Sequence, residues 1–242
     1  MSELFSIQLQ NRQQQGRDGV WLDLPTTTEQ VQAALRQIGI SSDNPQGLFI
    51  SGYFAEEEKR FAIPYNMVLA SNVDELNFLA ARLETLSAGE RAELNAALQA
   101  PQSELFSIGR ITDFPENVDY YVHLPDVRGP AQLGDYYLNR SGMVDMPEEW
   151  KGGIDTAQFG RYVAQQEQGA FTQYGYLVKS GDEWQKVHEG QPVPEEYRVL
   201  SFPVPEVMRD AANIPPPVQP ETEPQKVIPI FLNGKDSAER MK

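Results

Sequence analysis

The sequence predicts an α+β protein built from small mixed subdomains in series, with antiparallel strands, short helices and a disordered, Pro-rich C-terminal tail. Three observations favour this class. Stretches in which polar and apolar residues alternate, as in strands, are interleaved with stretches whose apolar residues recur at helical spacing. Gly and Pro separate these short stretches. The end of the chain is so rich in Pro and acids that it favours disorder over a packed core.

Residues 1–70 are predicted to form an N-terminal α+β subdomain. The run VWLDL at 20–24 alternates like a strand, and Thr26 with Glu29 has the spacing of a helix capping box. The helix that follows has its apolar stripe at Val31, Ala34, Leu35 and Ile38. Further strands are predicted at GLFISGYF and, after a solvated EEEKRF turn, at 61–63.

Residues 71–102 are predicted to form a helical hairpin subdomain. Asn72 with Glu75, and Ser87 with Glu90, each have the capping spacing that starts a helix. Almost no linker separates the two helices, so they are expected to pack together. The buried stripe of the first is predicted at Leu76, Leu79, Ala80, Leu83 and Leu86.

Residues 103–180 are predicted to form a C-terminal α+β subdomain. It opens with SELFSI at 103–108, the same six letters that occupy residues 2–7, and each copy is expected to begin a strand. Shared composition explains this repeat better than an ancient duplication, because the flanking sequences differ. The later elements are predicted as a strand at VDYYVHLP, a short helix at PAQLGDYYLNRSG, a helix capped by Asp155 with Phe159, Tyr162 and Val163 facing inward, and a strand at AFTQYGYLV.

Residues 181–242 are predicted to be an acidic, Pro-rich extension that is partly disordered. Ordered folding is expected to thin near residue 200. The sequence ends at SAERMK, where a helix pattern is only beginning, which suggests a truncated chain.

Charge and composition exclude several classes of protein. The chain has 35 acids against 20 bases, a net charge of −15, which argues against direct binding of nucleic acid or of an anionic membrane. It has no Cys, no long apolar run and no signal-peptide pattern, so a cytoplasmic protein is predicted. An acidic surface alone usually serves solubility.

The sequence offers little for catalysis. Its two histidines, His123 and His188, are far apart and lack an acid at metal-ligand spacing. Neither a P-loop nor a Gly-x-Ser-x-Gly elbow occurs. We therefore predict no catalytic residue, no metal site and no cofactor, and a protein that is not an enzyme.

Two Tyr-Tyr pairs stand beside acids, at 120–121 and 136–137. Tyr rings rimmed by the nearby carboxylates of Asp119, Asp126 and Asp135 are typical of protein interfaces. The simpler interpretation, that one Tyr of each pair packs in the core and the other meets solvent, is favoured for any single residue.

Six blocks together resemble the ArdA-type antirestriction proteins. In order they are GVWLDLP with TTTEQVQAALRQIG, LFISGYF, VDELNFLAARLETL, NVDYYVHLPDV, LGDYYL and IDTAQFGRYVAQQEQGAFTQYGYL. The resemblance covers about residues 18–178 and is strongest in the last block. It implies an elongated homodimer, encoded by mobile genetic elements such as conjugative transposons, with three small domains per chain. It also implies a DNA mimic that occupies the DNA groove of type I restriction-modification enzymes.

Such a mimic would use carboxylates as phosphate surrogates. Residues 1–180 carry a formal charge of −11, so a dimer would carry −22, the charge of roughly 37 Å of duplex. Acids crowd residues 113–155, where the only bases are Arg128, Arg140 and Lys151. The predicted partner-binding acids are Asp113, Glu116, Asp119, Asp126, Asp135, Asp145, Glu148, Glu149 and Asp155.

A second hypothesis comes from a different class. The chain could be an adaptor of a mobile element that binds another defence or conjugation protein without imitating DNA. Apolar contacts would then dominate, and binding would resist both salt and charge reversal.

Overall fold

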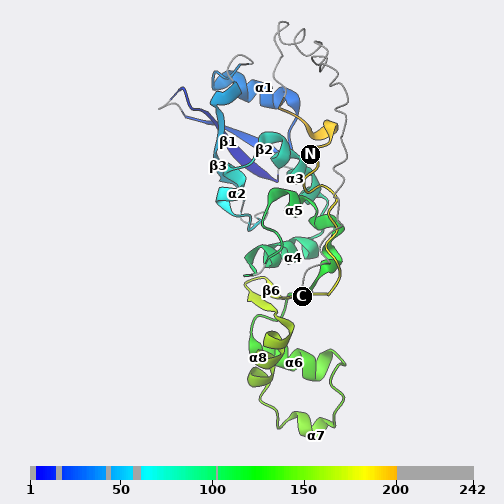
Figure 1. Ribbon diagram of the computed structural model, residues 1–242. Helices are drawn as coiled ribbons and strands as arrows, with labels where there is room; N and C mark the ends of the chain where they lie inside the picture. The colour runs from blue at the N-terminus through cyan, green and yellow to red at the C-terminus, as the bar shows by residue number, and fades with distance from the viewer. Residues whose placement is uncertain (1–3, 15–17, 42–44, 57–60, 102, 201–242) are drawn as a thin grey trace, which may run out of the picture. The chain divides into compact units, whose positions relative to one another are not determined.

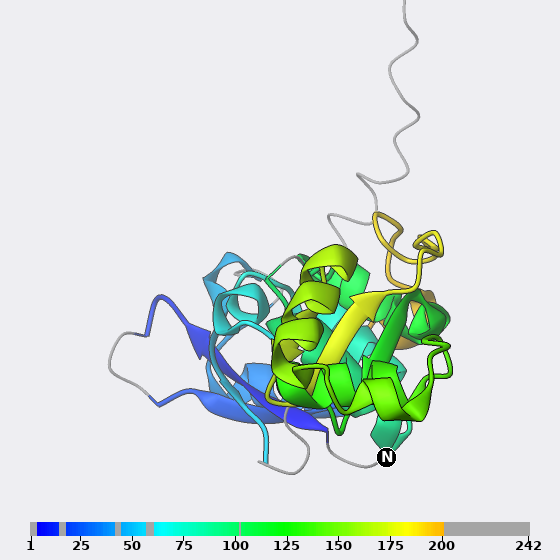
Figure 2. The same cartoon turned by 90° about the horizontal axis from the view of Figure 1, so that it is seen from below.

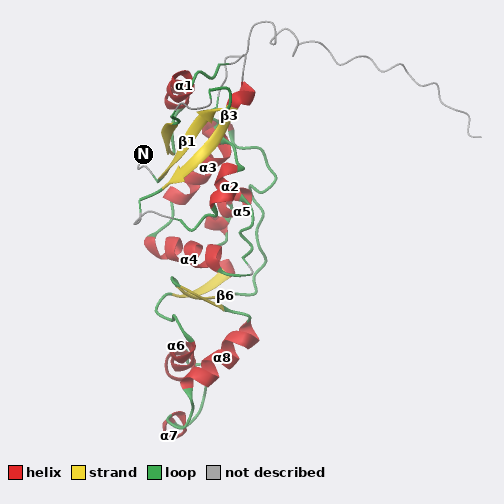
Figure 3. Cartoon of the chain, turned by 90° about the vertical axis from the view of Figure 1, so that its left-hand side faces the viewer, coloured by secondary structure: helices red, strands yellow, loops and turns green. Residues whose placement is uncertain are grey.

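The computed structural model describes residues 4–14, 18–41, 45–56, 61–101 and 103–200. These residues form two three-stranded antiparallel sheets and a set of short helices, which confirms the predicted α+β class (Figures 1 and 3). In the described part, no helix has both the length and the apolar character needed to cross a membrane. The expected disorder of the Pro-rich tail and the helix at SAERMK fall on residues 201–242, outside the described residues.

The first sheet has the order β2-β1-β3, from Val20–Leu24, Phe5–Asn11 and Leu48–Phe54. Alternate residues of β1 are buried, and Ile7 pairs with Leu22 on one side and Tyr53 on the other. Figure 2 shows these strands in blue. The helix α1 (Thr28–Gln37) follows β2, and the 3-10 turn η1 (Pro45–Gly47) precedes β3.

The α1 helix begins one residue later than its sequence pattern suggested. Thr27 is the N-cap, and its capping-box partner is Gln30 rather than Glu29. Thr26 is instead buried, and its backbone N–H donates to Asn77 Oδ1 at 2.7 Å. Thr26, the expected cap, is therefore held by a tertiary contact with Asn77, and Thr27 caps the helix.

The next helices are α2 (Tyr65–Leu69), α3 (Val73–Glu84) and α4 (Ala88–Gln99). Both predicted capping boxes, at Asn72 and at Ser87, are confirmed. The strand expected at 61–63 is wrong: this segment is irregular, although the side chains of Phe61 and Ile63 are buried. The EEEKRF turn before it lies mostly outside the described residues.

The two longer helices of this region were predicted to pack together, yet each packs mainly against other elements. Helix α3 packs against β2 and α5, whereas α4 packs against β4 and β6 of the second sheet. Residues 1–203 form one contact unit, so their contacts do not mark the predicted subdomain boundaries. The boundaries after residues 70, 102 and 180 therefore stay a prediction.

The second copy of SELFSI does not form a strand. Residues 103–107 are irregular and lead into α5 (Ile108–Thr112), where the Ser107 hydroxyl accepts from the Arg110 N–H. The first copy pairs on both sides within a sheet. The same letters thus form a strand only where neighbouring strands complete the backbone hydrogen bonds.

The 3-10 turns η3 (Phe114–Glu116) and η4 (Val118–Tyr120) then lead into strand β4 (Tyr121–Leu124). Helix α6 (Pro130–Asp135) continues as a π-helical turn, η5 (Tyr136–Arg140). The short α7 (Glu148–Lys151) precedes α8 (Thr156–Glu167), which Asp155 caps as predicted. Tyr162 was expected to face inward, yet its side chain is exposed.

The strand predicted at AFTQYGYLV is in fact a hairpin of β5 (Ala170–Thr172) and β6 (Gly175–Lys179). The second sheet has the order β4-β6-β5. Strand β6 separates two hydrophobic clusters, because Tyr176 packs with Leu133 and Val127 while its neighbour Leu177 joins the main core.

Residues 181–200, which we call the strap, contain the 3-10 turn η6 (Glu195–Tyr197). The strap, yellow to orange in Figure 1, runs back from β6 along α5 to α3. Its contacts place it on the body of the fold, although the sequence assigned it to the partly disordered extension.

Candidate functional site

The nine acids predicted to bind a partner lie at the α5–η3 junction, on η3, on η4, in the β4–α6 connection, on α6, in the η5–α7 connection, on α7 and at the N-cap of α8. The structure separates them by environment. One is buried, three form ion pairs within the chain, and five are exposed without an ion pair among the described residues.

Asp113 is buried, with 0% of its surface exposed. One carboxylate oxygen accepts the His188 backbone N–H at 2.6 Å, and the other accepts that of Glu189 at 3.2 Å. Asp113 therefore anchors the strap. Its prediction as a phosphate surrogate is wrong, because the carboxylate does not reach the surface.

Three acids are paired with bases. Glu116 forms an ion pair with Arg82, Asp135 lies 3.2 Å from the Arg140 guanidinium, and Glu148 lies 2.6 Å from Lys151 Nζ. These pairs reduce the local negative charge. Glu148 nevertheless keeps 81% of its side chain exposed, so its carboxylate remains accessible to a partner.

The remaining acids face solvent. Asp155 accepts the Gln158 N–H at 2.9 Å as the N-cap of α8, while its side chain stays exposed. The other four have neither an ion pair nor a side-chain hydrogen bond within the described part of the chain: Asp119, Asp126, Asp145 and Glu149.

A further acid, missed by the sequence analysis, lies near Asp119. Glu93 on α4 is partly buried, and this burial, reinforced by the charges of Glu90 and Asp119, raises its pKa to about 8. Its Oε1 has no hydrogen-bond partner among the described residues. The Glu90 and Glu93 spacing of three along a helix was a sequence signal for this proximity. The proximity of the carboxyl groups of Glu90, Glu93 and Asp119 therefore lowers the stability of the fold.

Helices α6 and α8 hold the acids of residues 126–155 through a close crossing. A Cβ on Gly134 would collide with the carbonyl of Thr156, and one on Gly160 would collide with that of Pro130. Only glycine allows these two backbones to touch. The sequence analysis missed this contact, although both glycines lie within the predicted helices.

Both Tyr pairs pack ring against ring. The centroids of Tyr120 and Tyr121 are 4.9 Å apart, and those of Tyr136 and Tyr137 are 5.5 Å apart, both edge to face. Tyr121 is buried and Tyr120 only partly so, as the simpler interpretation expected, while the second pair is partly buried throughout.

Glu167 at the end of α8 ties the second cluster together. Its carboxylate accepts hydrogen bonds from the hydroxyls of Tyr137 and Tyr176, the latter at 3.0 Å. Burial and these bonds to a carboxylate raise the pKa of both Tyr hydroxyls. Glu167 therefore joins α8 to η5 and β6 and is not available as a surface charge.

Arg110 fixes the middle of the strap. Its guanidinium lies 4.7 Å from the Phe106 ring centroid and 5.6 Å from that of Trp184, and is held 3.1 Å from both Glu104 and Glu189. A hydrogen bond from Lys179 lowers the pKa of Glu104. Most of the charge in this part of the fold is therefore neutralised internally.

The histidines belong to the framework. The ring of His123 lies 2.9 Å from the Tyr174 carbonyl, and His188 packs edge to face on Phe78. Within the described ranges, no three His, Cys, Asp or Glu side chains are placed to hold a metal ion.

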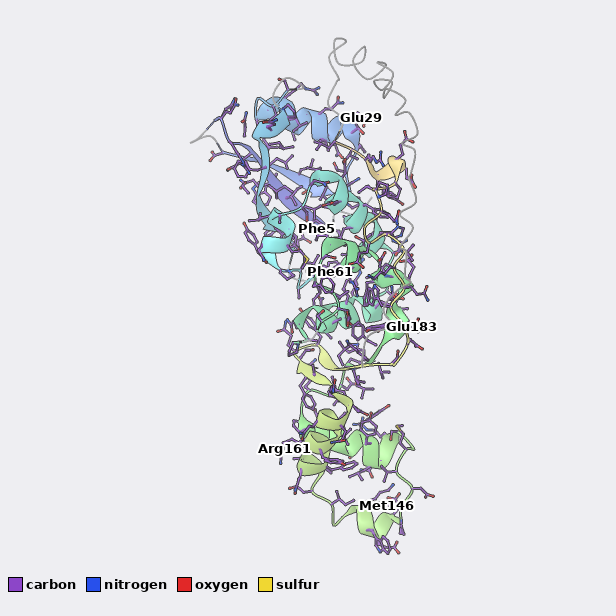
Figure 4. The ribbon with its side chains drawn as sticks, viewed as in Figure 1. Phe5, Glu29, Phe61, Met146, Arg161 and Glu183 are labelled. Carbon is purple, nitrogen blue, oxygen red and sulfur yellow. The ribbon has the colours of Figure 1, made fainter. Side chains whose placement is uncertain are left out.

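The exposed carboxylates between residues 119 and 155 are thus the candidate binding surface among the described residues. In Figure 4, Arg161 lies on α8, Met146 beside α7 and Glu183 on the strap, and side chains extend outward around each of them. A comparison with curated proteins finds no matching relative. The family model described as "Antirestriction protein (ArdA)" matches residues 15–178, which include β2 and β3 of the first sheet, almost all of the second sheet and every predicted acid, but not β1. The chain belongs to the ArdA family of antirestriction proteins.

Proposed function

We propose that this protein inhibits type I restriction-modification enzymes by binding in their DNA groove as a mimic of DNA. One observation supports this proposal above the others: five of the predicted acids are exposed and form no ion pair among the described residues, and some acids lie close together. Burial is the main cause of the raised pKa of Glu93, and the nearby charges of Glu90 and Asp119 add to it. A protein that needed acids only for solubility would gain stability by spreading them.

The exposed acids are suited to a groove that binds phosphates. Such grooves present Lys and Arg to the DNA backbone, and binding releases counterions from that backbone. Carboxylates on a rigid fold can occupy the same positions, and their field would accelerate the encounter. A homodimer acting in the cytoplasm would double the available negative charge. The doubled charge is similar to that of about one turn of duplex DNA.

The test is competition with duplex DNA for a purified type I methyltransferase core at low salt. The variant carries three reversals, Asp126→Lys, Asp145→Lys and Glu149→Lys, at exposed acids without partners in the described structure. We expect at least a hundredfold loss of competition, since three favourable charge contacts become repulsive.

The matched control reverses three exposed acids of the strap, Glu183→Lys, Glu195→Lys and Glu196→Lys, which lie outside the family match. It changes the net charge equally and should weaken competition far less. Equal losses in the two variants would show that net charge alone matters. Binding that survives the first variant and high salt would contradict mimicry and support the adaptor hypothesis.

A further inference from the structure

The loop at residues 141–155, which we call the α7 loop, exposes two large apolar side chains. Met143 is 76% exposed and Trp150 is 66% exposed. Figure 1 shows the loop, with α7 on it, on the side of α6 and α8 that faces away from β6. A Trp side chain has a large apolar area, so a partner that covers this loop would bury a large apolar surface.

The backbone of the loop holds Trp150 in a defined turn. Its N–H donates to the Pro147 carbonyl at 3.0 Å, and its own carbonyl accepts the Gly153 N–H at 3.0 Å. These bonds limit the conformations of the backbone that carries the ring. Ordering the loop on binding would therefore cost less entropy.

The charge around the ring is almost purely negative. Asp145, Glu148 and Glu149 are exposed, and Lys151 is the only base among residues 141–155. The Lys151 side chain is only 15% exposed, and its Nζ is engaged by Glu148. The outer side of the loop therefore combines an indole ring with carboxylates and offers no competing cation.

The same combination already binds a guanidinium elsewhere in this chain. Arg110 lies over the rings of Phe106 and Trp184 while Glu104 and Glu189 hold its nitrogens. Arg140 repeats the arrangement on a smaller scale, over Tyr136 and beside Asp135. In both sites an aromatic face and a carboxylate satisfy the two halves of a guanidinium, its flat surface and its N–H edge.

We propose that Trp150 and one of the exposed carboxylates of the same loop form a receptor for one arginine of the partner's DNA-binding surface. This inference rests on the proposed function and adds to it a contact that is not electrostatic imitation of phosphate. The guanidinium stacks on the indole while its edge donates to the carboxylate. A lysine ammonium would satisfy only the charge, so the receptor selects arginine over lysine.

The first experiment uses two peptides, hexa-arginine and hexa-lysine, titrated by calorimetry into the full chain. We expect the wild type to bind hexa-arginine about fivefold more tightly than hexa-lysine. Trp150→Ala should reduce this ratio to about one, and Trp150→Phe should keep most of it. The control is Tyr162→Ala, which removes an aromatic side chain of similar exposure, 60%, from α8. An unchanged ratio in Trp150→Ala would overturn the proposal.

The second experiment measures affinity for the methyltransferase core. Trp150→Ala should weaken binding about tenfold, by a similar factor at about 0.1 M and about 0.5 M salt, because stacking is screened little. A loss below twofold would contradict the receptor. If the core does not bind wild-type protein, the proposed function fails, and the peptide ratio then decides the Trp150 site alone. An unchanged thermal unfolding midpoint shows that each variant is folded.

Discussion

Two neighbouring stretches of this protein contain the same residue types and use them in opposite ways. Between residues 104 and 117, carboxylates turn inward, where Asp113 holds backbone N–H groups and Glu104 and Glu116 pair with bases. Between residues 119 and 155, most carboxylates face solvent. The difference teaches that the number of acids in a stretch does not measure its surface charge. The strap supplies backbone N–H groups to Asp113 and Asn117 in the first stretch, whereas it meets the second at Tyr120, whose ring packs on Trp184.

Removing the strap should have the largest effect on the inward stretch. A chain ending at Ser180 would leave Arg110, Asp113 and Asn117 without the partners that residues 184–189 supply. Several buried polar groups would lose their bonds at about 1–3 kcal/mol each, which can exceed the stability of an ordinary domain. We expect loss of cooperative thermal unfolding by circular dichroism. A chain ending at Leu200 keeps these contacts and should unfold like the full chain; equal behaviour of the two would contradict the anchoring role.

Single substitutions should show the same contrast on a smaller scale. Asp113→Ala leaves two backbone N–H donors without an acceptor and should lower the free energy of unfolding by about 3 kcal/mol. Asp119→Ala removes an exposed carboxylate and should change it by less than about 0.5 kcal/mol. Urea denaturation measures both. Comparable losses would mean that the two stretches do not differ in the way described.

Glu93 combines features of both stretches, since it is partly buried like the inward carboxylates and lies near the exposed Asp119. Its folded pKa of about 8 exceeds the unfolded value of about 4.3, so the native state holds an extra proton between these values. Stability should therefore fall as pH rises through this window. Glu93→Gln should equal wild type near pH 4 and exceed it by about 1 kcal/mol at pH 8, a figure reduced for solvent screening. Thermal melts across this pH range measure the difference, and a pH-independent difference would exclude this explanation.

The outward acids should matter least for stability. The triple variant Asp126→Lys, Asp145→Lys and Glu149→Lys should unfold within about 1 kcal/mol of wild type, because these side chains have no ion pair in the described structure. Calorimetry measures this alongside the competition assay. A large destabilisation would mean that these carboxylates support the fold and that a loss of binding reflects unfolding.

The sequence predicted well where local chemistry decides. The caps at Asn72, Ser87 and Asp155 follow from short patterns, as do the alternating strands β1 and β2. The environment of Asp113 could not be predicted, because its partners are 75 and 76 residues away. Register and long-range pairing leave little trace in a single sequence, which is also why the second SELFSI copy and the β5–β6 hairpin were misjudged.

Strand β6 serves two hydrophobic clusters at once, and this constrains what the chain can tolerate. Tyr176 belongs to one cluster and Leu177 to the other, so inserting a single residue before them would exchange their sides. A phenol would then enter the main core, and an aliphatic chain would face Glu167 without a hydroxyl to offer. Insertions of two residues, which preserve the alternation, should therefore be better accepted in the β5–β6 turn than insertions of one.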